Sequence, residues 1–143
     1  MKIGVIGKGF VGSAVYDGLG QLDHDMSFHD PKYDTSIQDI KDTEIVFVSV
    51  PTDMRDDGTC DTSIVESVLR DLTHINYYGI IAIKSTVVPG TTKDLQERYK
   101  KLNICCVPEF LRERSALTDF VLEHDVLVVG ATDEKVATRV VRA

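Results

Sequence analysis

Six short runs of apolar residues recur along the 143-residue chain, and polar segments separate them. Most of the runs are rich in β-branched side chains, which is typical of strands buried on both faces of a parallel sheet. The expected strands are Ile3–Ile6, Met26–His29, Glu44–Val50, Gly79–Lys84, Ile104–Val107 and Val126–Gly130.

Between these runs the spacing of apolar residues becomes helical. In Thr62–Leu72 they fall at positions 64, 65, 68, 69 and 72, which places them on one face of a helix. Helices are also expected at Ser13–Leu22, at Lys93–Lys101 and from about Asp133 onward. A helix-like connection is expected at Asp34–Lys41, and a loop with a short helix at Pro108–Phe120.

Strands that alternate with helices predict an α/β fold. We expect a doubly wound parallel six-stranded sheet of the Rossmann type, with right-handed crossovers and strand order 3-2-1-4-5-6. The length suits one sizeable core and is short for two, so residues 1–143 are expected to form one domain. Ligands bind such sheets outside the carboxyl ends of the strands.

The first strand runs directly into Gly7-Lys-Gly-Phe-Val-Gly12, a Gly-x-Gly-x-x-Gly pattern that opens the first helix. In this context the first glycine permits the tight turn, the second lets a pyrophosphate approach the backbone, and the third lets the helix pack on the strand. Free amides at the helix start, together with its dipole, favour phosphate. The pattern predicts a dinucleotide site formed by Gly7, Lys8, Gly9, Phe10, Val11 and Gly12.

An acid follows the second expected strand, at Asp30. A carboxylate there can accept hydrogen bonds from the adenosine ribose and repel the 2′-phosphate of NADP, which favours NAD as the cofactor. The alternative is a turn residue, because Asp30 precedes Pro31. Lys32 lies close in sequence and bears on the choice between NAD and NADP.

The formal net charge is −7. An acidic chain is not expected to bind nucleic acid or an anionic membrane, since both require a basic patch. No apolar run approaches the roughly 20 residues of a membrane span. The first strand begins almost at Met1, so no signal peptide is expected and a cytoplasmic protein is predicted.

Three cysteines and four histidines are present, and their spacing fits neither a disulfide framework nor a metal site. Cys105 and Cys106 fall in an apolar strand, where buried inert thiols are expected. Cys60 falls in a polar loop without a neighbour that would obviously activate it. The histidines are scattered and are interpreted as structural: His24, His29, His74 and His124.

Candidate catalytic groups follow the fourth and fifth strands. Thr86 could orient a water molecule or contact a nicotinamide, or it could form a turn that caps the next helix. Glu109 and Glu113 would face the same way if a helix began at Pro108. Such acids either stabilise the helix start or act as a general base toward water.

Four motifs together resemble the nucleotide-sugar 6-dehydrogenases, the UDP-glucose and GDP-mannose dehydrogenase family. They span nearly the whole chain but match only the family's N-terminal, NAD-binding domain. The last motif resembles the UDP-glucose and GDP-mannose branches more than the N-acetylated-sugar branch. The motifs are the glycine loop, Val48-Ser-Val-Pro-Thr52, Lys84-Ser-Thr-Val-Val-Pro-Gly-Thr-Thr92 and Pro108-Glu-Phe-Leu-Arg-Glu113, with Ala116 and Asp119-Phe120 after it.

This resemblance implies a two-step, NAD-dependent oxidation of a sugar C6 alcohol to a carboxylate, with UDP-glucose as the expected substrate. By resemblance, Thr86 and Glu109 handle water and proton transfer, and Glu113 lies at the nicotinamide end. Glu109, Phe110, Leu111 and Arg112 lie along the sugar nucleotide. Asp30 and Thr52 contact the cofactor, and the strand end adds Val50 and Pro51 to the expected cofactor-binding residues.

The family's catalytic cysteine, and the lysine and asparagine that assist it, belong to motifs absent from these 143 residues. The chain alone is therefore expected to bind NAD without oxidising a sugar to an acid. The segment from Asp30 to Glu44 is also shorter than is usual in the family. Alternatives are a stand-alone NAD-binding module, one half of a split enzyme, a GDP-mannose 6-dehydrogenase, or a dehydrogenase of the 3-hydroxyacid or prephenate kind; an oligomer is possible.

Overall fold

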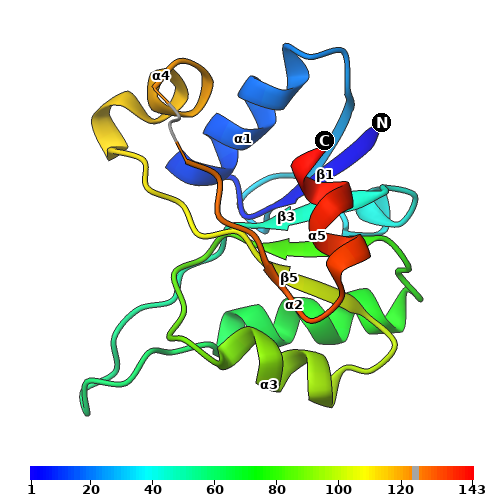
Figure 1. Cartoon of the computed structure of the whole chain (residues 1–143), viewed down its shortest axis with the longest axis vertical. Helices are drawn as coiled ribbons and strands as arrows, with labels where there is room; N and C mark the ends of the chain where they lie inside the picture. Colours follow the sequence, from blue (N-terminus) through cyan, green and yellow to red (C-terminus); the bar gives the residue numbers. More distant parts are fainter. Residues whose placement is uncertain (124–125) are drawn as a thin grey trace.

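The computed structural model describes residues 1–123 and 126–143, so His124 lies outside the described residues. Figure 1 shows a central sheet with helices on both sides. In chain order the elements are β1 (Lys2–Ile6), α1 (Phe10–Gly20), β2 (Asp25–His29), η1 (Ile37–Ile40), β3 (Ile45–Val48), α2 (Ser63–His74), β4 (Ile80–Ile83), α3 (Thr91–Arg98), β5 (Asn103–Cys106), η2 (Glu113–Ser115), α4 (Ala116–Val121), β6 (Gly130–Ala131) and α5 (Glu134–Val141).

The sheet confirms the predicted Rossmann-like α/β class, but the predicted strand order is wrong. The observed order is β2-β1-β3-β4-β5-β6, with β3 beside β1 rather than outside β2. The burial of the strands explains this order. All four residues of β3 are buried, so this strand needs a neighbour on each side, whereas β2 is partly exposed along its length and can form the edge.

The sixth strand also differs from the prediction. It comprises only Gly130–Ala131 and runs antiparallel to β5, while Val126, Leu127 and Val128 are exposed and no strand forms before Gly130. A parallel strand requires a connection that crosses back over the sheet. Here α4 packs against α1 instead, so the chain re-enters the sheet in the opposite direction.

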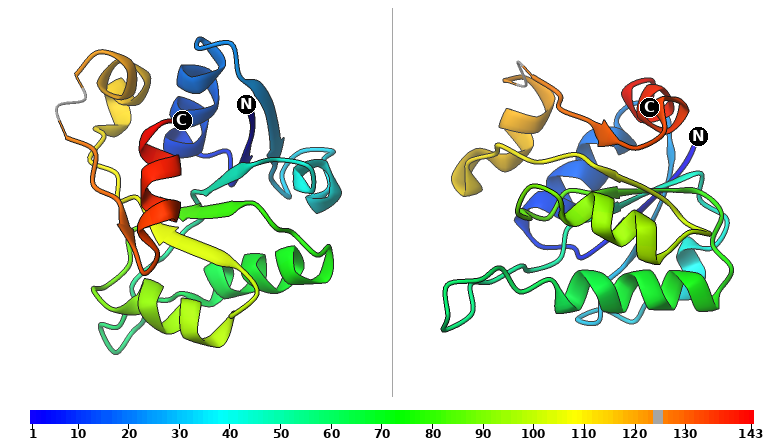
Figure 2. Two further views of the ribbon diagram at one scale, coloured as in Figure 1. Left: turned by 45° about the vertical axis from the view of Figure 1, so that its right-hand side comes forward. Right: turned by 60° about the horizontal axis from the view of Figure 1, so that its bottom comes forward.

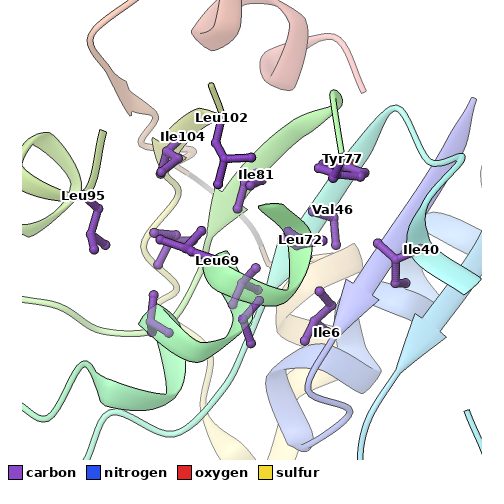
Figure 3. Close-up of a cluster of buried hydrophobic side chains, with 14 of the residues drawn as sticks. Ile6, Ile40, Val46, Leu69, Leu72, Tyr77, Ile81, Leu95, Leu102 and Ile104 are labelled. Atoms are coloured by element: carbon purple, nitrogen blue, oxygen red, sulfur yellow. The ribbon is translucent and has the colours of Figure 1, made fainter. Parts of the chain in front are cut away.

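Alternate residues of the strands build two hydrophobic cores, one on each face of the sheet. Helices α2 and α3, with η1, cover one face through residues such as Leu69, Leu95 and Ile40 (Figure 3). Helices α1 and α5 lie over the other face (Figure 2). Val15 of α1 and Val140 of α5 belong to the core on that face. The two cores hold the carboxyl ends of β1, β3, β4 and β5 at a common edge.

The helices lie near their predicted positions, with two differences that matter for the site. Helix α1 begins at Phe10 rather than Ser13, so it starts directly at the glycine loop. No helix begins at Pro108: residues 108–112 are not helical, and η2 begins at Glu113. The condition under which Glu109 and Glu113 would face the same way is therefore not met.

Within the described residues, no helix is both long and apolar enough to cross a membrane.

Candidate cofactor and catalytic site

Two of the loop glycines are required by close backbone contacts. Gly7 has φ +86°, and a Cβ there would lie 2.5 Å from the carbonyl oxygen of Ser49. A Cβ on Gly12 would lie 1.9 Å from the carbonyl oxygen of Gly7. Any larger residue at either position would force apart the turn and the first helix, as the sequence pattern predicts.

Gly9 differs, because a Cβ built on it meets no atom within 4 Å. The space in front of this glycine is therefore open. No side chain caps the start of α1, and the first bond of the helix runs from the Ser13 amide to the Gly9 carbonyl. The amides of Phe10, Val11 and Gly12 thus have no intrahelical acceptor, so the corner fits an anion such as a pyrophosphate.

Asp30 is tied to this corner by its side chain. Its Oδ2 accepts the Lys8 backbone amide at 2.7 Å, and its Oδ1 accepts the Lys32 amide at 2.8 Å. Burial alone would raise the pKa of Asp30, but the amides of Lys32 and Lys8 outweigh it and hold the pKa below the ordinary value. The bond to Lys32 makes the turn, and the bond to Lys8 fixes an ionised carboxylate beside the glycine loop.

Two lysines surround Asp30 and differ in their environments. The ammonium of Lys8 lies 4.0 Å from the ring centroid of Tyr16 and 4.1 Å from that of Phe28, and the residue is partly buried. Lys32 is exposed, and its charge helps to lower the pKa of Asp30. Lys8 and Lys32 thus each donate a backbone amide to the Asp30 carboxylate and each carry an ammonium group on the side chain.

Hydroxyl groups connect the ends of β3 and β4. Ser85 Oγ accepts the Val50 amide at 3.0 Å and donates to the Val50 carbonyl at 2.7 Å. Thr52 donates its hydroxyl to the Thr86 carbonyl at 2.6 Å, and the half-buried thiol of Cys60 approaches the same oxygen at 3.8 Å. These contacts place Val50, Pro51, Thr52 and Thr86 together at the carboxyl edge.

Thr86 does not cap the following helix. The residue before α3 is Gly90, with φ +94°, and no side chain caps this helix. The alternative role of Thr86 as a helix cap therefore finds no support, whereas its position at the end of β4, beside Thr52, suits contact with a ligand at this edge.

A buried ion pair joins the ends of β4 and β5. Lys84 Nζ lies 2.5 Å from Glu109 Oε2, and the two side chains are 2% and 5% exposed. Oε2 makes no hydrogen bond of regular geometry within the described residues, so the contact is one of charge. The ammonium also lies 5.9 Å from the Phe47 ring centroid and 5.7 Å from that of Phe120. A charged pair in such apolar surroundings is typical of a functional site.

Arg112 holds the segment that follows Glu109. Its backbone amide, Nε and Nη2 all donate to the carboxylate of Asp119, at 2.7 to 3.0 Å, and Nη2 also donates to Glu123 at 2.5 Å. These bonds hold the pKa of Asp119 well below its ordinary value. The guanidinium therefore binds two carboxylates of its own chain, a role that the sequence did not indicate.

A groove of about 570 Å³ borders this segment. Glu109, Phe110, Leu111 and Arg112 line it together with Val126 and Val128, and Phe110 is 69% exposed. Glu113 is exposed at the start of η2. The structure thus places Glu109 and Phe110–Arg112 along one groove, while Glu113 lies beyond its lining.

Sequence reasoning assigned no role to four residues that shape the site. The motifs quoted from the sequence contain Lys84, Ser85, Asp119 and Phe120, but the sequence does not show which residues they contact.

The cysteines are free, and burial raises the pKa of the Cys105 thiol to about 12, which fits the expected inert thiol.

The mostly parallel sheet, the open glycine corner and the acid after β2 define a dinucleotide-binding domain of the dehydrogenase class. The family model described as the UDP-glucose/GDP-mannose dehydrogenase family, NAD binding domain, matches residues 27–143. The chain belongs to this family and is its NAD-binding domain. The rival assignment to the 3-hydroxyacid or prephenate dehydrogenases is thereby set aside.

Individual relatives agree with this assignment. The chain is 30% identical over 186 residues to a UDP-glucose 6-dehydrogenase of Haloferax volcanii, with 94% of this chain and 42% of the relative covered. The solved UDP-glucose dehydrogenase of Pyrobaculum islandicum superposes with a TM-score of 0.86 at 26% identity, over 98% of this chain and 43% of that one. GDP-mannose dehydrogenase of Pseudomonas aeruginosa shares the fold, with a TM-score of 0.83 at 19% identity, over 99% and 43%.

The chain spans about two fifths of the length of these relatives. The alignment with the Haloferax protein is longer than the 143 residues of this chain, so that relative carries segments which this chain lacks.

Proposed function

We propose that residues 1–143 form one domain, the cofactor-binding part of a UDP-glucose 6-dehydrogenase-like oxidoreductase. Such an enzyme oxidises the C6 alcohol of a nucleotide sugar to a carboxylate in two NAD-dependent steps. The proposal rests on one observation: the open glycine corner, Thr86 and the groove beside Glu109 all lie at the carboxyl ends of the strands. The names of the relatives favour UDP-glucose over GDP-mannose.

The residues of this chain would bind and orient the reactants. When bound, NAD accepts a hydride; the chain's part is to hold its pyrophosphate at the first amides of α1 and its adenosine ribose at Asp30. Thr86, which follows β4, orients a water molecule that takes part in the reaction. Glu109 accepts a proton in the transfer steps, and the ion pair with Lys84 keeps the Glu109 carboxylate in place.

The remaining expected roles rest on the resemblance alone. Glu113 contacts the nicotinamide end, and Phe110, Leu111 and Arg112 lie along the sugar nucleotide. The bonds from Arg112 to Asp119 and Glu123 favour a contact through the backbone and Phe110 rather than through the guanidinium. A cytoplasmic location and an oligomer stay predictions.

By itself, the chain is proposed to bind NAD without turning over a nucleotide sugar, because the nucleophilic cysteine of the family has no counterpart here. Calorimetry should detect NAD binding, and incubation with NAD and UDP-glucose should produce no NADH absorbance. Absence of NAD binding at millimolar concentration contradicts the cofactor assignment. Steady NADH production contradicts the proposed need for a further catalytic part.

A second candidate is one half of a split enzyme, the alternative that the sequence also left open. Adding a polypeptide that carries the downstream part of the family should then restore NADH production from UDP-glucose. A stand-alone NAD-binding module would bind the cofactor equally well and gain no activity from any such addition.

A further inference from the structure

The corner around Asp30 contains more positive charge than the recognition of a ribose requires. Both oxygens of Asp30 are held by backbone amides, from Lys8 at 2.7 Å and from Lys32 at 2.8 Å. The residue is only 8% exposed, so its carboxylate is fixed. Each of the two residues that hold it also carries an ammonium group.

Lys8 is held by aromatic rings rather than by an acid. Its ammonium lies 4.0 Å from the ring centroid of Tyr16 and 4.1 Å from that of Phe28. Tyr16 and Phe28 meet edge to face, with centroids 5.5 Å apart, and Tyr33 meets Phe28 in the same way. Contacts of an ammonium with ring faces are weaker than charge-assisted hydrogen bonds to phosphate, so this cation can be recruited by a phosphate group.

We propose that the Asp30 corner is a latent 2′-phosphate site, in which Lys8 supplies the cation and the Asp30 carboxylate alone excludes NADP. This inference rests on the proposed cofactor site and concerns its specificity. Asp30 excludes NADP by repelling the phosphate from a fixed position, and the corner does not lack a cation for that phosphate. Removal of the negative charge then uncovers binding of NADP through Lys8.

The test is calorimetric titration of the 143-residue chain with NAD and with NADP. The variants are Asp30→Ser, Asp30→Ser/Lys8→Met and, as a matched loss of one positive charge, Asp30→Ser/Lys101→Met. Lys101 is exposed and precedes β5, at the opposite edge of the sheet. Asp30→Asn serves as a second substitution of nearly equal shape, and circular dichroism checks that each variant is folded.

We expect the unchanged chain to bind NAD at least tenfold more tightly than NADP. The affinity of Asp30→Ser for NADP should be higher than that of the unchanged chain by about tenfold or more. Adding Lys8→Met should lower this NADP affinity again by about tenfold, whereas adding Lys101→Met should leave it unchanged.

Three results would overturn the proposal while leaving NAD binding intact. They are equal affinity of the unchanged chain for NAD and NADP, no gain of NADP affinity in either Asp30 variant, and equal NADP affinity of Asp30→Ser with and without Lys8→Met. The third result, together with loss of the gain in an added Asp30→Ser/Lys32→Met variant, would assign the cation to Lys32 instead of Lys8. Failure of the unchanged chain to bind either dinucleotide refutes the cofactor site itself.

Discussion

Replacing Lys84 by methionine leaves a buried carboxylate without its cation, and we expect a large loss of stability. The Lys84 and Glu109 side chains are 2% and 5% exposed, and their charged atoms lie 2.5 Å apart. At that distance, with an effective dielectric constant of about 20, two unit charges attract by about 7 kcal/mol. The cost of removing both charges from water offsets much of this attraction, so the pair contributes little net stability.

A single charge left in this position keeps its dehydration cost and loses the attraction. We therefore expect Lys84→Met to lower the free energy of unfolding by about 3–5 kcal/mol. Domains of this size have a total stability of about 5–15 kcal/mol, so the loss is large but measurable. Urea denaturation followed by circular dichroism gives the value directly, and Lys93→Met, at an exposed position of α3, should change it by less than about 0.5 kcal/mol.

The double variant Lys84→Met/Glu109→Leu separates charge from packing. Buried ion pairs can be replaced by apolar residues of similar volume at little or no cost, so this variant should recover most of the lost stability. A loss below about 1 kcal/mol in Lys84→Met would show that water reaches the pair in solution. A double variant as unstable as the single one would place the effect in packing and refute the argument from a lone charge.

Further predictions concern the glycines and the acids. Gly9→Ala should leave the stability within about 0.5 kcal/mol but weaken NAD binding about tenfold or more, because its Cβ enters the open corner, whereas Gly12→Ala should cost about 1–3 kcal/mol. Gly18→Ala places a Cβ 2.4 Å from an α4 side chain and should destabilise by about 1–3 kcal/mol in thermal unfolding, while Gly20→Ala, with its nearest atom at 3.7 Å, should not. The pKa of Asp30 is lower in the folded chain than its ordinary value of 3.8, so the carboxylate stabilises the fold above pH 3.8 and this contribution is lost as the pH falls through the folded pKa. Urea denaturation should therefore show a smaller loss of stability between pH 6 and pH 3 in Asp30→Asn than in the unchanged chain.

The glycine loop could be predicted in detail because its function depends on the backbone. Gly7 and Gly12 leave no room for a side chain, and only a sequence with glycine at both positions can form the turn. The class of fold followed from strands and helices that alternate. Both features depend on residues that are close together in sequence, so the pattern of residues along the chain is enough to predict them.

The order of the strands depends on neighbours that are distant in sequence. The pattern of Glu44–Val50 nevertheless contained the answer, because a strand that is apolar on both faces belongs in the interior of a sheet. The sixth strand was misplaced for a different reason. Val126, Leu127 and Val128 have the composition of a strand but remain exposed, so composition alone did not predict pairing.

Pairs of charged side chains were the least predictable part of the site, although the sheet topology makes one of them visible. Lys84 follows Ile83 and Glu109 lies three residues after Cys106, and these two strand ends pair in the parallel register. Once β4 and β5 are known to be neighbours, an isolated lysine and an isolated glutamate at the same edge become candidates for contact. Arg112 offers no such signal, because three acids follow it within eleven residues.

The contacts of Arg112 limit what this half of the site can offer a nucleotide sugar. Its guanidinium is paired with Asp119 and Glu123, so Arg112 offers no unpaired positive charge to the groove. Lys84 is likewise paired with Glu109 and buried. A diphosphate placed along this groove would therefore find an exposed aromatic ring and backbone groups, but neither of these cations free. Under the proposed function, the charge that binds the diphosphate of a nucleotide sugar therefore has to come from residues other than Lys84 and Arg112.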